Sequence, residues 1–411
     1  MITRTSEDCV PLYEAELFGR DALQNPFPHY AAIRDLGPVV RLKSPAVLAI
    51  GRFADVRKAL QSPDILISGK GIGFNDFINK PVPEPGVLTS DGERHRKMRL
   101  PLMKQLSPVA LKPIRDMLRG MMIEQIARVT DGRSLDGIAD IARHLPLGAI
   151  SRLVGIPEQD RAKMLRWASA SFNVLGVIER EGRIIPELLD DLGTATEVRD
   201  YLTGLDPSTL RSGSWAAQLF EEVISRGMSI GDARSSMRAF VLPSLDTTIY
   251  AMGHLLYNLG RNPDQYQMLR AAPTLIPSAV YESMRFSPVA RWFSRVAAAD
   301  YVAGEVFVPK GERVMIMYGS ANRDPRRYEN PDAFDVRRNP MDQLGWGAGP
   351  HVCAGMHLAR MEMEVLLEAL VQRVAGIEVD EPTLGANNGL YGFDALPIRL
   401  FAADSTPAGR A

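Results

Sequence analysis

The middle of the chain has a mostly helical pattern of apolar and polar residues. From about residue 91 to 260, this pattern is broken only by glycine and proline clusters. Its longest stretch, 229–260, has Ser229 as a capping residue, Asp232 three residues later and Gly260 at its end. It predicts one long, largely buried central helix. Pro243 would bend this helix, because proline cannot donate a main-chain hydrogen bond.

Other segments have different patterns. The runs in 38–51 and those after the central helix predict short strands joined by Gly/Pro turns, and 387–402 predicts a hairpin-like tail. The Gly/Pro-rich stretch 68–86 predicts a long irregular loop. No internal repeat or low-complexity linker divides the chain. We therefore expect one domain over 1–411, mostly α with a small β region, that includes an N-terminal extension over 1–24.

The composition is that of an ordinary globular protein. The 411 residues are 45% hydrophobic and 24% charged, and the net charge of −1 gives no general indication of nucleic-acid binding. The first residues lack the apolar segment of a secretion signal or membrane anchor, so we expect a cytoplasmic protein. The two cysteines, Cys9 and Cys353, cannot form a disulfide framework or a four-cysteine metal site. Cys9 has no role that the sequence indicates.

The most specific stretch is the loop 345–355, GWGAGPHVCAG, which leads into a second predicted helix ending at residue 374. Its glycines would let main-chain N–H groups approach a ligand. A helix N-terminus beside Cys353 would favour a thiolate. A lone thiolate suits a single axial bond to a haem iron. A small buried side chain and a catalytic nucleophile are the alternatives for an isolated cysteine.

The residues around the cysteine distinguish these alternatives. An aromatic residue, spaced glycines and a basic residue surround it, as Trp346, Gly347, Gly349, His351, Cys353 and Gly355. This pattern resembles the haem-binding signature of the cytochrome P450 superfamily. The resemblance implies a single triangular domain. It also implies a haem b, with Cys353 as its iron ligand, between the central helix and the helix of the 345–374 segment.

Further motifs extend the resemblance from about residue 25 to 400. Glu282 and Arg285 match a buried ion pair that ties the core to the segment 332–338 in this family. Four basic residues match the family's contacts to the haem propionates: His95, Arg99, Arg295 and His351.

Asp246 and Thr247 match the acid–alcohol pair of the family's central helix. The resemblance implies that Asp246 relays protons from solvent and that Thr247 holds the reacting oxygen and a water in place. An alternative is a hydroxyl that bonds back to its own helix. The chain departs from the family pattern just before the pair, where Pro243 and Ser244 stand in place of a small residue and glycine.

The resemblance implies a monooxygenase that uses O₂ and receives electrons from NAD(P)H through a reductase and a separate [2Fe–2S] ferredoxin. An acidic ferredoxin could dock on basic residues that flank the haem motifs: Arg94, Arg96, Lys97 and Arg360. We expect a monomer with no nucleic-acid or membrane partner. A peroxide-driven peroxygenase, a rearrangement catalyst and a haem-based sensor are the alternatives.

The sequence is most similar to bacterial members that oxidise para-substituted benzoic acids, through segments such as SGKGIGFNDF and NNGLYGFDALP. Lys70 occupies a place where a basic residue could steer a carboxylate. The other residues expected to line the pocket are Ile72, Phe74, Phe172, Leu175, Phe240, Leu242, Ser244, Trp292 and Phe393. A neutral aromatic, phenylpropanoid or terpenoid substrate is the alternative to an aromatic acid.

Overall fold

The computed structural model describes residues 10–80 and 84–403, and most of them are helical, as predicted. Cys9 lies outside the described residues. The α-helices are α1 Arg20–Gln24, α2 Phe27–Leu36, α3 Phe53–Leu60, α4 Asp76–Asn79, α5 Gly92–Leu106, α6 Pro108–Leu111, α7 Arg115–Arg128, α8 His144–Ala149, α9 Glu158–Asn173, α10 Leu189–Gly204, α11 Trp215–Ser225, α12 Ile230–Val241, α13 Asp246–Arg261, α14 Pro263–Ala271, α15 Ile276–Phe286, α16 Tyr318–Ala321 and α17 Met356–Arg373.

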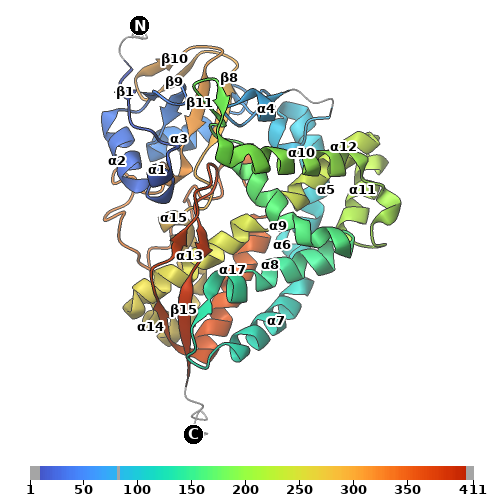
Figure 1. The fold of residues 1–411 in the computed structure, drawn as a ribbon, viewed down its shortest axis with the longest axis vertical. Helices are drawn as coiled ribbons and strands as arrows, with labels where there is room; N and C mark the ends of the chain where they lie inside the picture. The colour runs from blue at the N-terminus through green and yellow to red at the C-terminus, as the bar shows by residue number, and fades with distance from the viewer. Residues whose placement is uncertain (1–9, 81–83, 404–411) are drawn as a thin grey trace.

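The strands are short and form small sheets; the largest lies near the N-terminal helices, and β12 and β15 lie beside α13 and α17 (Figure 1). They are β1 Leu12–Tyr13, β2 Val40–Leu42, β3 Leu48–Ile50, β4 Leu66–Ile67, β5 Leu135–Asp136, β6 Glu179–Arg180, β7 Arg183–Ile184, β8 Phe293–Ala297, β9 Tyr301–Ala303, β10 Val306–Val308, β11 Arg313–Ile316, β12 Val374–Val379, β13 Thr383–Leu384, β14 Phe393–Ala395 and β15 Pro397–Ala402. The largest sheet has the order β1-β2-β3-β11-β8-β4. In it, β11 is parallel to β3 and antiparallel to β8.

Two expectations about the ends of the chain need correction. The described part of the N-terminal segment, residues 10–24, belongs to the fold, because β1 pairs with β2 through Leu12 and Arg41. The carboxyl-terminal tail is not a hairpin of its own. Its strand β14 pairs with β13, and β15 pairs with both β12 and β5. The predicted loop 68–86 is mainly irregular, as expected, but contains α4, and its residues 81–83 lie outside the described part.

The central helix is two helices, not the single bent helix predicted over 229–260. α12 begins with a capping box in which the side chains of Ser229 and Asp232 bond each other's main-chain N–H groups. The helix ends at Val241, and α13 begins at Asp246. Pro243 lies in the break and has no N–H to donate, so the helical ladder cannot continue through it. The break places Asp246 in the first turn of a new helix.

Helix α13 lies at the centre of the helical region, beside α15 and α17 (Figure 1). It also packs on a π-helical turn, Gly137–Ala142, so closely that a Cβ on Gly253 would lie 2.5 Å from Cδ1 of Ile138. The side chains of Met252, Leu255 and Leu256 are fully buried in this contact region. Burying each such side chain contributes about 1.5–3 kcal/mol, so this packing fixes α13 relative to α17.

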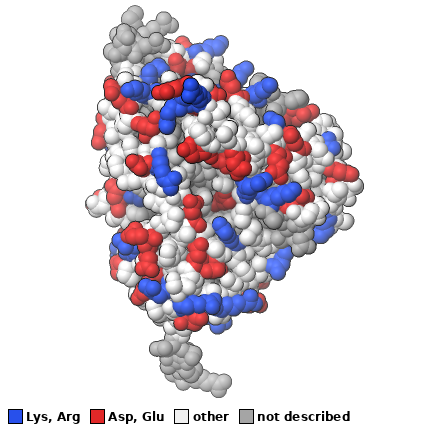
Figure 2. Space-filling view, in the orientation of Figure 1, with Lys and Arg blue, Asp and Glu red and all other residues white. Residues whose placement is uncertain are grey.

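The surface in Figure 2 carries intermixed basic and acidic side chains, in keeping with the net charge of −1. In the described part of the chain, no helix combines the length and apolar character needed to cross a membrane.

Candidate functional site

The cysteine loop is held by short main-chain bonds and by close packing. The N–H of Cys353 donates to the Trp346 carbonyl at 2.9 Å, so the loop folds back on itself. Gly349 has a φ of +69°, and a Cβ there would lie 2.2 Å from the Leu60 carbonyl oxygen. Only glycine fits this position, for both reasons. The Trp346 ring packs edge-on against Tyr281 at 5.8 Å, which anchors the loop to α15.

Protein atoms surround the thiol of Cys353, but the Cys353 side chain remains accessible from outside. On the same side, a Cβ on Gly355 would meet only the Cys353 sulfur, at 4.0 Å. These observations describe a cradle above the sulfur that side chains do not fill. Burial raises the pKa of the Cys353 thiol, while N–H groups of Gly355 and Met356 and the Arg99 guanidinium favour the thiolate. A bound cation at the sulfur would complete this stabilisation.

Four basic side chains predicted to contact haem propionates gather beside this cradle. The rings of His95 and His351 are 4.1 Å apart, and Arg99 donates to the Val352 carbonyl at 2.6 Å. Arg295 is buried and donates to the Ser294 carbonyl at 2.8 Å.

Little negative charge balances this group. Among the described residues, neither arginine has a carboxylate within ion-pair distance, and the nearest acid is Asp91, 3.9 Å from Nε2 of His351. Nε2 of His95 is buried and has no hydrogen-bond partner. Burial, together with Arg295, His95 and Arg99, lowers the pKa of His351 to about 3. A group with two carboxylates therefore fits this side of the cradle.

Asp246 and Thr247 lie at the start of α13, directly after the helix break. Asp246 is 6% exposed, and burial raises its pKa to about 7, against the charge of Arg143. The Thr247 hydroxyl donates to the Pro243 carbonyl at 2.6 Å, and the Ser244 hydroxyl donates to the Phe240 carbonyl. The break thus brings a buried acid and two hydroxyl groups to one segment.

Glu282 and Arg285 form a fully buried ion pair with two hydrogen bonds, of 2.7 and 2.8 Å. The guanidinium also donates to the carbonyls of Asn322, Pro331 and Ala333. These bonds connect α15 to the segment that precedes the cysteine loop. A planar arginine fork can make them together, and a lysine cannot.

Half of the residues expected to line a substrate pocket form one group. The N–H of Phe74 donates to the Leu175 carbonyl at 2.9 Å, and the Phe74 ring stacks on Trp292 at 4.2 Å. Ile72 bonds to β8 through its carbonyl, and Phe172 contacts Phe293 of that strand.

The remaining expected lining residues lie elsewhere. Phe240 packs on Trp215, and Leu242 and Ser244 lie in the helix break. Phe393 belongs to a different aromatic group, in ring contact with His254 and Tyr257.

Sequence reasoning selected Lys70 as the basic residue of the pocket and missed Arg238. Lys70 is exposed, and its carbonyl accepts from Arg313 at 2.8 Å, whereas its ammonium group has no hydrogen bond or ion pair to another described residue. Arg238 lies on α12, four residues before Leu242, and its Cδ is 3.9 Å from the place of a Cβ on Gly86. Its side chain is partly buried and makes no hydrogen bond or ion pair among the described residues, although the charge of Glu84 favours the guanidinium and that of Arg199 opposes it. The sequence could have indicated Arg238, because it lies four residues before Leu242 and therefore on the same side of the predicted helix.

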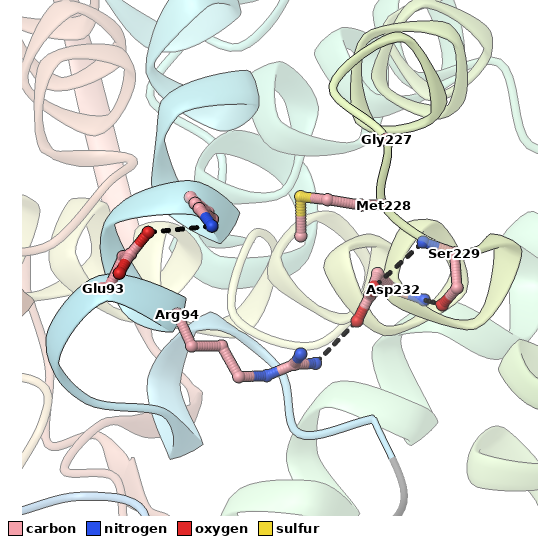
Figure 3. A pocket seen from close by; sticks show the side chains of 7 residues that line it. Glu93, Arg94, Gly227, Met228, Ser229 and Asp232 are labelled. Atoms are coloured by element: carbon pink, nitrogen blue, oxygen red, sulfur yellow. Dashed lines mark hydrogen bonds and ion pairs between the residues drawn. The ribbon is translucent and has the colours of Figure 1, made fainter.

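Three of the four cations expected to dock a ferredoxin are paired within the protein. Arg94 bonds Asp232 of α12 at 2.6 Å (Figure 3). Lys97 bonds Glu93 at 2.8 Å, also drawn in Figure 3. These residues border a surface cavity of about 540 Å³ between α5 and the start of α12. Arg360 bonds Glu364 at 3.1 Å. Local acids thus neutralise part of the positive charge at this surface, and Arg96 is the one of these four residues without an ion pair to another described residue.

An accessible cysteine at a helix N-terminus, in a mainly helical fold with basic side chains beside it, has the features that a haem-thiolate site requires. A model of the cytochrome P450 family matches residues 215–376. Cytochrome P450 CYP199A2 of Rhodopseudomonas palustris is 32% identical over 403 residues, which cover 96% of this chain and 95% of that protein.

Solved structures agree on the fold. Cytochrome P450 CYP109Q5 of Chondromyces apiculatus has a TM-score of 0.78 at 23% identity, with 95% of this chain and 99% of that chain covered. CYP108D1 of Novosphingobium aromaticivorans has a TM-score of 0.77 at 25% identity, with coverages of 93% and 97%.

The chain belongs to the cytochrome P450 family, which confirms the resemblance and the fold drawn from the sequence. It is a monooxygenase whose cofactor is haem with a cysteine thiolate ligand. Its co-substrate is O₂, and NAD(P)H supplies electrons indirectly.

Proposed function

We propose that this enzyme oxidises a small aromatic acid, by hydroxylation or O-demethylation, with Cys353 as the iron ligand. In this proposal, electrons arrive from NAD(P)H through a reductase and a [2Fe–2S] ferredoxin. The observation that carries the substrate class is the partly buried guanidinium of Arg238, which makes no hydrogen bond or ion pair among the described residues. Burial disfavours its charge, and Glu84 acts on it without forming an ion pair, so a ligand carboxylate would stabilise it further.

The residues of the cradle would hold the cofactor. Cys353 would bind the iron, and the four basic side chains would hold the two propionates, as His95, Arg99, Arg295 and His351. Gly355 keeps the cradle free of a side chain near the sulfur, because a Cβ there would lie 4.0 Å from it. When bound, the haem supplies O₂ activation, which the electron-donating thiolate favours.

Asp246 would supply protons to the pocket. With a pKa raised to about 7, it is partly protonated at neutral pH and can both give and regain a proton. The Thr247 hydroxyl donates to the Pro243 carbonyl, so its oxygen can accept a hydrogen bond from a water or a protonated group. Apolar side chains of the Phe74 and Trp292 group would orient an aromatic ring and exclude water.

The substrate proposal is tested by spin-state titration of the purified holoenzyme. We expect 4-methoxybenzoate to shift the haem from low to high spin, and 4-methoxytoluene to do so only weakly. Arg238→Gln should weaken the acid about tenfold, since a charge-assisted hydrogen bond contributes 1.5–3 kcal/mol, and leave the neutral compound unchanged. Lys70→Gln is the matched control. A response to the neutral compound alone would replace the acid with a neutral aromatic or terpenoid substrate.

The electron route is tested separately. We expect product to form with NAD(P)H, reductase and ferredoxin, in proportion to the NAD(P)H consumed. Product formation only with hydrogen peroxide would favour the peroxygenase alternative. A Soret band of the reduced carbon monoxide complex near 450 nm would establish the thiolate ligand.

A further inference from the structure

Consecutive main-chain carbonyls at the carboxyl end of α9 bond to segments that are distant in the sequence. The last carbonyls of a helix have no partner inside the helix, so other groups must satisfy them. Here the Leu175 carbonyl accepts from the N–H of Phe74 at 2.9 Å. The carbonyls of Val174 and Gly176 both accept from the side-chain amide nitrogen of Asn75, at 2.8 Å each. The end of α9 is therefore fastened to the loop that precedes α4.

A third segment, near the carboxyl terminus of the chain, completes this arrangement. The Asn388 side chain donates to the Asn173 carbonyl at 2.8 Å, and its main-chain N–H donates to Oδ1 of Asn173 at 2.9 Å. The Asn388 carbonyl accepts from the indole N–H of Trp292 at 3.0 Å, and the Trp292 ring stacks on Phe74. A Cβ on Gly176 would lie 2.5 Å from Cβ of Asn388, so these segments approach as closely as glycine permits. Three segments thus enclose one side of the aromatic group of the expected pocket.

The loop before α4 is also held on its other side, by the main sheet. The N–H and the hydroxyl of Ser294 donate to the carbonyls of Ile72 and Gly73, at 2.9 and 3.0 Å. Arg313 of β11 donates to the Gly71 carbonyl at 3.0 Å and to the Ser294 hydroxyl at 2.8 Å. Because the sheet holds the loop, an outward movement of α9 cannot carry the loop with it. Such a movement must break the bonds between them.

The side chain of Asn75 has the chemistry that its place requires. Its Oδ1 accepts from the N–H of Ile78 at 3.1 Å and so caps α4, while its nitrogen donates to the two carbonyls of the α9 end. An amide supplies one acceptor and two donors, and no other side chain of this length does so. Aspartate in its place would keep the cap and the shape, but it would lose both donors. Asn75→Asp therefore separates the bonds to α9 from the capping of α4.

We propose that Asn75 is a specificity-determining residue, which fixes the length of the pocket and excludes substrates with long ring substituents. The proposed function supplies the substrate class on which this inference rests, a substituted benzoic acid. Phe172 and Leu175, two expected pocket residues, belong to the end of α9 that Asn75 holds. A long substituent would have to push this end outward and break the two hydrogen bonds of Asn75. The wild-type enzyme should therefore prefer short substituents.

Spin-state titration of the holoenzyme with 4-methoxybenzoate and 4-hexyloxybenzoate tests the inference. A pocket without a length limit would bind the hexyl ether more tightly, because it buries more apolar surface. We expect the wild type to bind it about tenfold more weakly than the methyl ether. Asn75→Asp and Asn75→Ala should each lower this ratio of Kd values about tenfold, since two hydrogen bonds no longer resist the movement of α9. The ratio cancels any repulsion between the new aspartate and the acid. Asn262→Asp, whose amide bonds the Asn258 carbonyl at the other end of α13 from Asp246, is the matched control.

The inference is overturned if the wild type binds both ethers about equally, or if both Asn75 variants keep the wild-type ratio within about twofold. A merely structural role would lower stability and leave this ratio unchanged. The same comparison with 4-phenylimidazole and its longer biphenyl analogue needs no carboxylate, because an imidazole nitrogen ligates the haem iron. If neither acid binds but the ratio for the imidazoles responds to Asn75, the proposed acid substrate falls and this inference stands. If the acids bind and no ratio responds, only this inference falls. Each variant is first matched to wild type by its carbon monoxide difference spectrum.

Discussion

The buried acid Asp246 should make the protein less stable as pH rises. An ordinary aspartic acid has a pKa of 3.8, whereas burial raises the pKa of Asp246 to about 7. The unfolded chain therefore releases this proton first, and unfolding becomes easier over the whole range between these two values. By linkage, the cost is about 2 kcal/mol at pH 5 and about 4 kcal/mol at pH 8.

Asp246→Asn removes the titrating group and keeps a similar shape. The free energy of unfolding of the variant, relative to wild type, should therefore increase by roughly two to three kcal/mol from pH 5 to pH 8. Urea unfolding of the holoenzyme, followed by far-ultraviolet circular dichroism at fixed haem concentration, measures this difference. Thr247→Val, in the same helical turn, should show a difference from wild type that stays constant with pH. A constant difference for Asp246→Asn, within about 0.5 kcal/mol, would refute the raised pKa.

Three further changes test other parts of the site. Arg285→Lys should lower the free energy of unfolding by about 3–5 kcal/mol, because lysine cannot satisfy the buried carboxylate and three carbonyls together; a loss below 1 kcal/mol would contradict this. His95→Leu and Arg99→Leu should each speed haem transfer to apomyoglobin about tenfold, since each removes a charge-assisted contact, whereas Arg96→Leu should not. Ser244→Gly should change substrate affinity or the product formed per NAD(P)H at least twofold; if neither changes, the hydroxyl has no role in the pocket.

Local chemistry made part of this structure predictable. The start of α12 followed from Ser229 and Asp232, because a capping box depends on residues three apart. The Glu282–Arg285 spacing likewise joins residues on one helix face. The cysteine loop was recognisable because the backbone requires glycine at some of its positions. At Gly349, for example, the Leu60 carbonyl leaves no space for a Cβ.

Features that depend on distant partners could not be predicted in this way. Arg94 looked like a free surface cation, but its partner Asp232 comes from another helix, 138 residues later. Nothing local in the sequence distinguishes Arg238 from other charged helix residues, and only the packing of neighbouring segments around it shows that it is partly buried. The split between α12 and α13 escaped notice because the helical pattern of apolar residues continues through 242–245, while Pro243 interrupts the hydrogen bonds.

The hydroxyl of Thr247 has one proton, and this proton already makes a hydrogen bond within the protein. Because that proton goes to the Pro243 carbonyl, the oxygen turns only lone pairs toward its surroundings. In this state, the Thr247 oxygen can accept a hydrogen bond from a donor group but cannot donate one to an acceptor. To donate a proton of its own, it must first give up the Pro243 carbonyl, at a cost of about 1 kcal/mol. The occupancy of the residue 243 carbonyl therefore decides whether Thr247 can donate a hydrogen bond to a bound molecule or only accept one.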